Sequence, residues 1–482
     1  MHRKVNVLTF SVDVKDGAGK LAGAFTVVSN FITRAEELGY DMKWYCVLPH
    51  RKTAGAQDLS AFPGDCEVVT SGDLDAGWTP RECDETIVYA GNWIPQRTDW
   101  RTYKEDPSWI TTNLGRQVDL LKRVPGHKIF VNTCHSMLIS ERATWKEFPW
   151  LADLYDEIVT FGPGDEIMRL FDRIDGSAKD SRIRSKVRYI QHNTITEKDM
   201  THPEWTPVED KNMLQFYWQG RAEATCKGMK LWIDFKERAK EHGMDFNVMF
   251  NGVMSSIGNV NQLTITMKPK KVFFPFIEFH GRNYEHIEFS DEIEGKTIVH
   301  GAYRRADGLK LLQSAGFAMY TTKFPASTQF WPEYTTLEAI QQGTVLAVPS
   351  NYFDADGTFP GGDPEELALL PLPMDRTRLF TKKELATMDD EELERLRKME
   401  EDDWPRFKRL YDRLTSDPKY YDEWRERAWK THVHDVDWDS RVRMLIEGGT
   451  EVTEEDFPLE FGDGTGDAKG KTNLFDLLGS QR

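Results

Sequence analysis

The sequence is short of cysteine, and the cysteines it has are scattered. Its 482 residues include five Cys, at positions 46, 66, 83, 134 and 226, and none of them forms a C-x-x-C pair. An odd, dispersed set argues against a disulfide framework and against a zinc ribbon. We therefore expect reduced thiols in a cytoplasmic protein.

Long apolar runs are also absent. No stretch approaches the roughly 20 apolar residues that a membrane-spanning helix needs. The first apolar segment, residues 5–12, is interrupted by Asn6 and stopped by Asp13. This pattern predicts a strand rather than a signal peptide, so we expect neither a leader nor a membrane span.

Positive charge is in deficit. Lys and Arg number 62 against 79 Asp and Glu, and the formal net charge is −17. Such a balance argues against a protein that coats nucleic acid over its whole surface. Local basic stretches at 182–188, 268–271 and 304–305 still leave room for a nucleic-acid contact.

Hydrophobic periodicity predicts two α/β domains. Strand-like segments alternate with helical ones up to about residue 200, which is typical of a parallel sheet covered on both faces. Residues 201–212 contain two prolines, mixed charge and no period, so they are predicted to be a linker. The alternation then restarts. We expect Rossmann-like domains at 1–200 and 213–380, with a ligand-binding cleft between them.

The rest of the chain differs in composition. Residues 381–447 are helical in pattern and acidic at their start, and from about 448 the chain is rich in Gly, Asp, Glu and Lys. We expect a C-terminal helical segment at 381–447. Residues 448–482 are predicted to be a disordered tail.

A first motif lies in "GRAEATCKG", residues 220–228. Gly220 and Arg221 end a predicted strand, and Lys227 opens the next helical segment. A glycine lets the backbone approach a ligand, and two cations near a helix N-terminus favour a phosphate or diphosphate. A tight loop with two solvated cations would fit equally well, so this motif alone does not decide.

A second motif lies in "EYTTLEAIQQGTVLAVPS", residues 333–350. It places Glu338 in the first turns of a helix, where a carboxylate could accept both hydroxyls of a ribose. The main-chain amides of Tyr334, Thr335 and Thr336 could bind a phosphate at the helix start. The simpler alternative is that Glu338 only compensates the helix dipole.

Together the two motifs resemble the nucleotide-sugar half of GT-B glycosyltransferases of the large retaining group, similar to family 4. The resemblance implies a GT-B fold and transfer of a sugar, with retention, from a UDP-sugar or another nucleoside diphosphate sugar. It implies catalytic roles for Arg221 and Lys227 at the diphosphate, and donor binding by Gly220, Glu338 and the start of its helix. It implies that the helical segment at 381–447 packs back on the first domain, and it implies no further cofactor.

The N-terminal half fits this family more loosely. The resemblance places Gly17, Gly19 and Lys20, after the first predicted strand, against the donor phosphates. It places His135, in "VNTCHSM", near the transferred sugar as a catalytic residue. An ordinary buried or capping histidine is the alternative for His135.

One position departs from the family pattern. A second glutamate, which contacts the sugar, is usual eight residues before the helical one, and here Phe330 stands there. Glu333 lies close by and could take its place as a donor-binding residue. The departure leaves open a nucleotide-sugar-binding interaction protein without catalysis.

Two clusters of metal-ligand residue types are not expected to bind metal. "FDADG" (353–357) follows a predicted strand and is typical of an Asp-rich turn. "HVHDVDWD" (432–439) lies in the helical segment, where we expect packing and surface charge.

The tail carries an apolar peptide, "TNLFDLL". Exposed apolar side chains in a flexible segment indicate a docking partner or packing on the chain's own body. The peptide resembles those by which bacteriophage replication proteins hold a sliding clamp, with anchors at Leu474, Phe475, Leu477 and Leu478.

The clamp resemblance would make double-stranded DNA the acceptor. The protein would then resemble phage enzymes that add glucose or arabinose to 5-hydroxymethylpyrimidines, such as hydroxymethylcytosine, and would act in the host cytoplasm. A glycosyltransferase of bacterial surface polysaccharide is the competing hypothesis.

Overall fold

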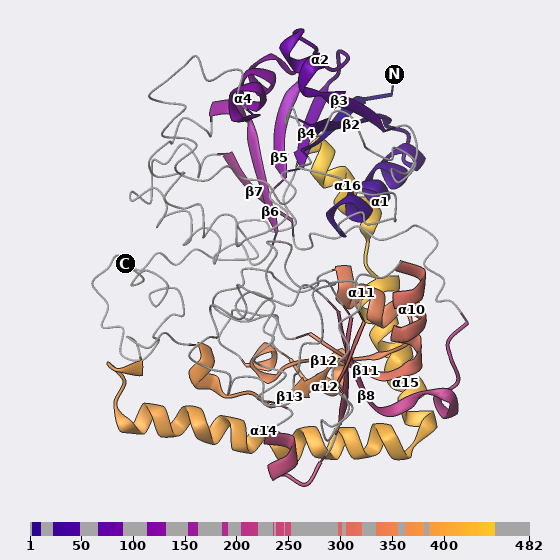
Figure 1. The fold of residues 1–482 in the computed structure, drawn as a ribbon, viewed down its shortest axis with the longest axis vertical. Helices are drawn as coiled ribbons and strands as arrows, with labels where there is room; N and C mark the ends of the chain where they lie inside the picture. The colour runs from indigo at the N-terminus through magenta and orange to yellow at the C-terminus, as the bar shows by residue number, and fades with distance from the viewer. Residues whose placement is uncertain are drawn as a thin grey trace. The chain divides into compact units, whose positions relative to one another are not determined.

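The structure is a computed structural model. It describes residues 2–10, 23–48, 66–89, 113–131, 153–161, 186–190, 204–219, 235, 238–244, 246–251, 297–300, 305–320, 334–354, 362–379 and 385–448. The chain forms two compact units. The first contains Met1–Asp199 and Asp437–Arg482, and the second contains Met200–Ser327 and Glu333–Val436. Figure 1 shows the helices and strands of both.

The first unit is built on a sheet of seven parallel strands. Their order is β3-β2-β1-β4-β5-β6-β7, so the chain order reverses between β1 and β4. The strands are β1 (Lys4–Phe10), β2 (Asp41–Leu48), β3 (Glu67–Thr70), β4 (Glu85–Tyr89), β5 (His127–Val131), β6 (Glu157–Phe161) and β7 (Val187–Ile190).

Helices cover this sheet because each presents an apolar stripe. In α1 (Gly23–Glu37) the side chains of Val28, Phe31 and Ala35 recur at helical spacing and are fully buried. The short α2 (Ser71–Asp75) begins with a capping box between Thr70 and Asp73. A further helix in this part of the chain is α4 (Asn113–Arg123).

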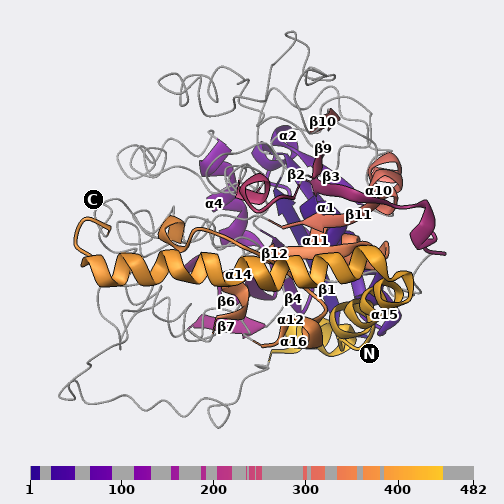
Figure 2. The same ribbon diagram turned by 90° about the horizontal axis from the view of Figure 1, so that it is seen from below.

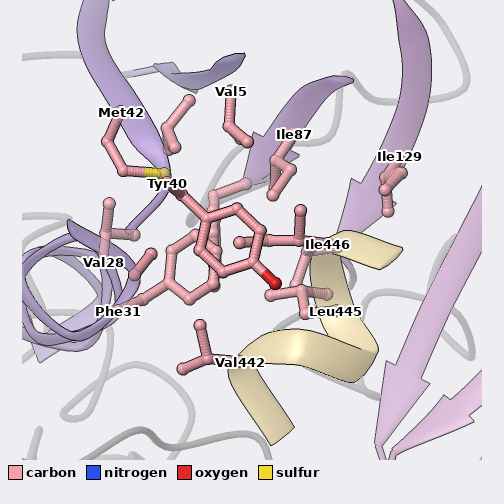
Figure 3. Packing of buried hydrophobic residues seen from close by; sticks show 14 of the residues in the cluster. Val5, Val28, Phe31, Tyr40, Met42, Ile87, Ile129, Val442, Leu445 and Ile446 are labelled. Atoms are coloured by element: carbon pink, nitrogen blue, oxygen red, sulfur yellow. The ribbon is translucent and has the colours of Figure 1, made fainter. Parts of the chain in front are cut away.

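The C-terminal helix α16 (Trp438–Glu447) completes the core of the first unit. Figure 3 shows Val442, Leu445 and Ile446 packed among side chains of α1 and the sheet, including Phe31 and Ile87. Polar contacts add to this seat: Arg34 pairs with Asp439 at 2.9 Å, and the guanidinium of Arg188 donates to the main-chain carbonyls of Met444 and Leu445.

The second unit has a sheet of six parallel strands in the order β10-β9-β8-β11-β12-β13. Counted within the unit, this is the 3-2-1-4-5-6 order of dinucleotide-binding sheets. The strands are β8 (Asn212–Gln219), β9 (Asn247–Asn251), β10 (Thr297–His300), β11 (Ala315–Met319), β12 (Val345–Pro349) and β13 (Leu370–Leu372). The helices and short turns around them are η5 (Val208–Asp210), α10 (Arg305–Ser314), α11 (Tyr334–Gln341), η7 (Ser350–Phe353), α12 (Pro364–Leu367), η8 (Arg376–Leu379), α14 (Asp390–Ser416), α15 (Pro418–Trp429) and η9 (Lys430–His434).

Aromatic rings form the core between this sheet and α14, a helix of 27 residues whose full length is seen in Figure 2. Phe216 of β8 stacks on Phe317 of β11, with ring centroids 4.9 Å apart. Trp404 and Phe407 of α14 pack against Phe235. Contacts between aromatic rings therefore attach α14 to this sheet.

Two features differ from the sequence prediction. The segment 381–447 was expected to pack back on the first domain, but α14 and α15 belong to the second unit, whereas α16 belongs to the first and packs in its core. The reason is that the aromatic face of α14 matches the aromatic strands of the second sheet. The short strands β3 and β13, of four and three residues, were not predicted.

Candidate functional site

The order of strands singles out one position in the second unit. β8 pairs in parallel with β9 on one side and β11 on the other, so the chain order reverses between β8 and β11. In open parallel sheets, ligands bind beyond the carboxyl ends of the strands at such a reversal. The structure therefore points to the loops that follow β8 and β11.

These two strands lead into the two motifs found in the sequence. β8 ends at Gln219, and Gly220 and Arg221 follow it directly in the chain, with Lys227 a few residues later. β11 ends at Met319 and is followed by the segment that leads to α11. The two motifs, about a hundred residues apart in the sequence, thus come after two strands that are neighbours in the sheet.

Helix α11 positions the described part of the second motif. It lies between β11 and β12 in a parallel crossover, so its N-terminus is on the side of the sheet where the strands end. Glu338 is only 4% exposed and Thr336 only 2% exposed, whereas Thr335 is half-buried. Tyr334 is the first residue of the helix.

Burial of Glu338 bears on its two interpretations. A glutamate that only compensates a helix dipole is ordinarily on the surface, because desolvating a carboxylate is costly. Glu338 is instead packed inside the unit, one turn after the helix start. Buried carboxylates are retained where they accept specific hydrogen bonds, so the geometry favours a dedicated acceptor over a general surface charge.

A buried ionic cluster at the ends of β12 and β13 was missed in the sequence. Arg376 is 2% exposed and donates to both carboxylate oxygens of Asp354, at 3.1 and 3.0 Å. It also contacts Ser350 and Asp403, at 2.5 and 3.1 Å. Burial raises the pKa of the Asp403 carboxyl, and the nearby Arg376 guanidinium opposes this shift.

This cluster explains part of the "FDADG" motif. Asp354 is engaged by Arg376 and belongs to the turn after η7, so its carboxylate organises the chain there. Nothing in the local sequence pairs it with an arginine 22 residues later. Only the proximity of the ends of β12 and β13 brings the two together.

The first unit has an equivalent reversal between β1 and β4. The loop with Gly17, Gly19 and Lys20 connects the carboxyl end of β1, at Phe10, to α1. His135 follows β5, which neighbours β4. Both predicted segments therefore continue from the carboxyl ends of strands.

Several predicted residues lie outside the described residues. They are Gly17, Gly19, Lys20, His135, Gly220, Arg221, Lys227, Phe330, Glu333, Leu474, Phe475, Leu477 and Leu478. Their assignments remain predictions, supported by the strands that precede them where those are described.

The histidines of "HVHDVDWD" have other partners. The ring Nε2 of His432 lies 2.7 Å from the carbonyl oxygen of Leu367, and burial lowers the pKa of this histidine. His434 contacts Asp435 at 2.7 Å. Within the described ranges, no three His, Cys, Asp or Glu side chains gather in a way that could hold a metal. In the same part of the chain, no helix is long and apolar enough to cross a membrane.

Comparison with known proteins identifies the architecture. No family model matches the chain, and no curated protein matches its sequence. An alpha-glucosyltransferase solved with UDP-glucose and DNA containing an abasic site matches with a TM-score of 0.59 and 16% identity, over 92% of this chain and 100% of that one. An alpha-glucosyltransferase in complex with UDP matches with a TM-score of 0.60 and 15% identity, over 92% and 99%.

A further structure, of an alpha-glucosyltransferase with UDP and a 13-mer DNA containing a HMU base, has a TM-score of 0.58 and 15% identity, over 92% of this chain and 100% of that one. At these identities the likeness establishes the fold. Two parallel sheets, each with its own reversal, and the return of α16 to the first unit agree with it. The chain therefore has the GT-B fold of glycosyltransferases.

Proposed function

We propose that the protein is a retaining glycosyltransferase that moves a sugar from a UDP-sugar to a hydroxyl group. The observation that carries this proposal is the adjacency of β8 and β11. β8 precedes the Gly220–Arg221–Lys227 motif in the chain and β11 precedes the Glu338 helix, which supports the proposal that both motifs serve one site at this reversal of the sheet. The GT-B fold shared with UDP-binding alpha-glucosyltransferases supports it.

In this proposal different residues bind the ribose, a phosphate and the diphosphate of the donor. Glu338 accepts hydrogen bonds from the ribose hydroxyls, and the amides at the start of α11 bind a phosphate. Arg221 and Lys227 neutralise the diphosphate as the bond between the sugar carbon and the phosphate oxygen breaks. The negative charge on the departing diphosphate is the charge that increases most in the transition state. The acceptor oxygen forms the new bond to the sugar carbon, and its proton passes to the departing diphosphate.

We further propose that the acceptor is 5-hydroxymethylpyrimidine in double-stranded DNA. Two of the three alpha-glucosyltransferase structures described above were solved with DNA, in one of them with a HMU base. The apolar peptide at Leu474–Leu478 supports the same acceptor, since a clamp tether would place the enzyme on DNA without a strongly basic body. Protein preparations should therefore modify DNA when given the correct donor.

The test is to incubate the protein with a panel of nucleotide sugars and duplex DNA that contains either 5-hydroxymethylcytosine or cytosine. Digested nucleosides are then examined by mass spectrometry. A sugar adduct only on the hydroxymethylated base supports the proposal. Donor binding without transfer or hydrolysis would instead favour a non-catalytic nucleotide-sugar-binding protein. Transfer to a saccharide acceptor but not to DNA would favour surface-polysaccharide synthesis.

A further inference from the structure

The end of α11 is closed by a residue from the chain segment that enters the second unit. The amides of Gly343 and Thr344 donate to the carbonyls of Ile340 and Ala339, at 3.0 and 3.1 Å, which is a Schellman ending. This pattern leaves the Gln341 carbonyl without a helical partner. The indole Nε1 of Trp205 donates to it at 2.8 Å.

Gly343 is needed for two reasons. Its φ of +68° lies in the left-handed region, which the Schellman ending requires. In addition, a Cβ at this position would lie 2.6 Å from two carbon atoms of the Trp205 ring. The absence of a side chain on Gly343 therefore makes the space in which Trp205 sits.

The guanidinium of Arg425, from α15, also contacts Trp205 and Thr206. It lies 4.8 Å from the Trp205 ring centroid and donates to the Thr206 carbonyl at 2.9 Å. Asp422 holds the same guanidinium at 2.5 Å. Trp205 and Thr206 are thus fastened between the end of α11 and α15. Trp205 lies five residues after Met200, the first residue of this unit.

Helix α11 depends on such contacts for its position. It has eight residues, and an isolated helix of this length is unstable in water. Leu337 and Ile340 bury its apolar face at 1% exposure each. Glu338 lies three residues before Gln341, so the two share a face of the helix about one turn apart. A shift at the Trp205 end would therefore move the Glu338 carboxylate.

We propose that Trp205 is a positioning residue for the donor nucleotide, acting through α11 on Glu338. This inference rests on the proposed function, because it assumes that Glu338 binds the donor ribose. Trp205 supplies two separable contributions, which are the N–H that caps Gln341 and the ring that fills the space over Gly343.

The experiment compares Trp205→Phe, Trp205→Ala, Gly343→Ala and the Gly343→Ala/Trp205→Ala double variant. UDP affinity is measured by calorimetry, and kcat and KM are measured with UDP-sugar. Trp205→Phe keeps a ring but loses the N–H, and we expect UDP affinity to fall roughly fivefold. Trp205→Ala should lower it roughly tenfold or more, with donor KM rising and kcat changing less.

The double variant tests the contact itself. Gly343→Ala should weaken UDP binding by forcing the Trp205 ring away, but in the Trp205→Ala background the ring is gone and the added penalty should shrink. Phe407→Leu is the matched control, because it loosens the aromatic core under α14. It should lower Tm and leave UDP affinity unchanged.

Glu338→Gln, measured in parallel, separates a failure of the donor-site assignment from a failure of the positioning role of Trp205. If it leaves UDP affinity unchanged, the donor-site assignment itself is wrong. If Glu338→Gln weakens UDP binding while both Trp205 variants lower only Tm, Trp205 is a stability residue and the positioning role is overturned.

Discussion

Arg376 binds Asp354 through two parallel hydrogen bonds, from Nε and Nη2 to the two carboxylate oxygens at 3.1 and 3.0 Å. The arginine is 2% exposed, and its remaining nitrogen contacts Ser350 and Asp403. The segments that follow β12 and β13 are joined by this single side chain. Its planar fork is what allows one residue to satisfy both carboxylates.

Replacing Arg376 should therefore be costly. Arg376→Met leaves Asp354 and Asp403 without their shared cation, and breaking a buried ion pair from one side typically costs about 3–5 kcal/mol. Urea unfolding of the variant, followed by circular dichroism, measures the loss. Arg406→Lys is the control, since Arg406 reaches Asp363 only at 3.4 Å on the surface. An equally small effect of both changes would show that the cluster contributes little to stability.

The predicted diphosphate contacts can be tested directly. Arg221→Ala/Lys227→Ala removes two cations, and each charge-assisted phosphate contact is worth about 1.5–3 kcal/mol. We expect UDP affinity to fall by at least two orders of magnitude and sugar transfer to stop, with the circular dichroism spectrum unchanged. Calorimetry measures the affinity. An unaltered affinity for UDP would remove these residues from the donor site.

Glu338→Gln keeps the shape of the side chain and removes its charge. Ribose contacts are made about equally in the ground and transition states, so donor KM should rise more than kcat falls. We expect roughly a three- to tenfold increase in KM, which steady-state kinetics with UDP-sugar will measure. Lys310→Met, at an exposed position of α10, is the control. A fall in kcat with KM unchanged would instead assign Glu338 to the transition state.

Lys211 predicts a pH dependence of stability. Burial lowers the pKa of this lysine to about 7, Arg425 adds to the shift, and its Nζ donates to the carbonyls of Gln313 and Ala315. In the unfolded chain its pKa is about 10.4. Between these values the unfolded state binds a proton that the folded state does not, so stability should rise with pH from about 7 to about 10.

The measurement is the free energy of unfolding of wild type minus that of Lys211→Met, at several pH values. This difference should be constant below about pH 7 and grow by up to about 4 kcal/mol towards pH 10. Lys310→Met, at an exposed position of α10, is the control and should show no such growth. A flat difference for Lys211→Met would mean that this lysine keeps its proton in the folded protein.

The packing of α16 in the core of the first unit predicts which strands a smaller side chain in this helix will destabilise. Leu445 is 1% exposed in the core of the first unit, and Leu→Ala at such a site typically costs about 2–5 kcal/mol. Hydrogen exchange should accelerate in β1 and β4 of Leu445→Ala, while strands of the second unit keep their protection. Arg443→Ala, on the exposed face of α16, serves as control. Uniform acceleration in both units would argue against a local role for this helix.

Much of the fold could be predicted from local patterns. Strands such as β8 and β12 are apolar runs bounded by glycine, proline or polar residues, and Gly343 marks the end of α11. These signals act over a few residues, through side-chain periodicity and backbone conformation. The alternation of strands and helices with a break near residue 200 was sufficient to predict two α/β units. The residue types of the candidate donor motif were also visible, because glycine, cation and carboxylate each have a direct chemical use.

The tertiary structure alone decided which distant residues meet. Trp205 lies in a segment without hydrophobic periodicity. Nothing near it in the sequence indicates that its indole N–H binds the Gln341 carbonyl beside Gly343. The ion pair of Arg376 with Asp354 was equally hidden, and so was the division of the predicted 381–447 segment, in which α16 joins the first unit and α14 joins the second. The adjacency of β8 and β11 is likewise a contact between distant segments that the tertiary structure decides. Such contacts depend on the packing of whole surfaces, to which each residue contributes only a small share of the free energy, and local sequence does not encode that sum.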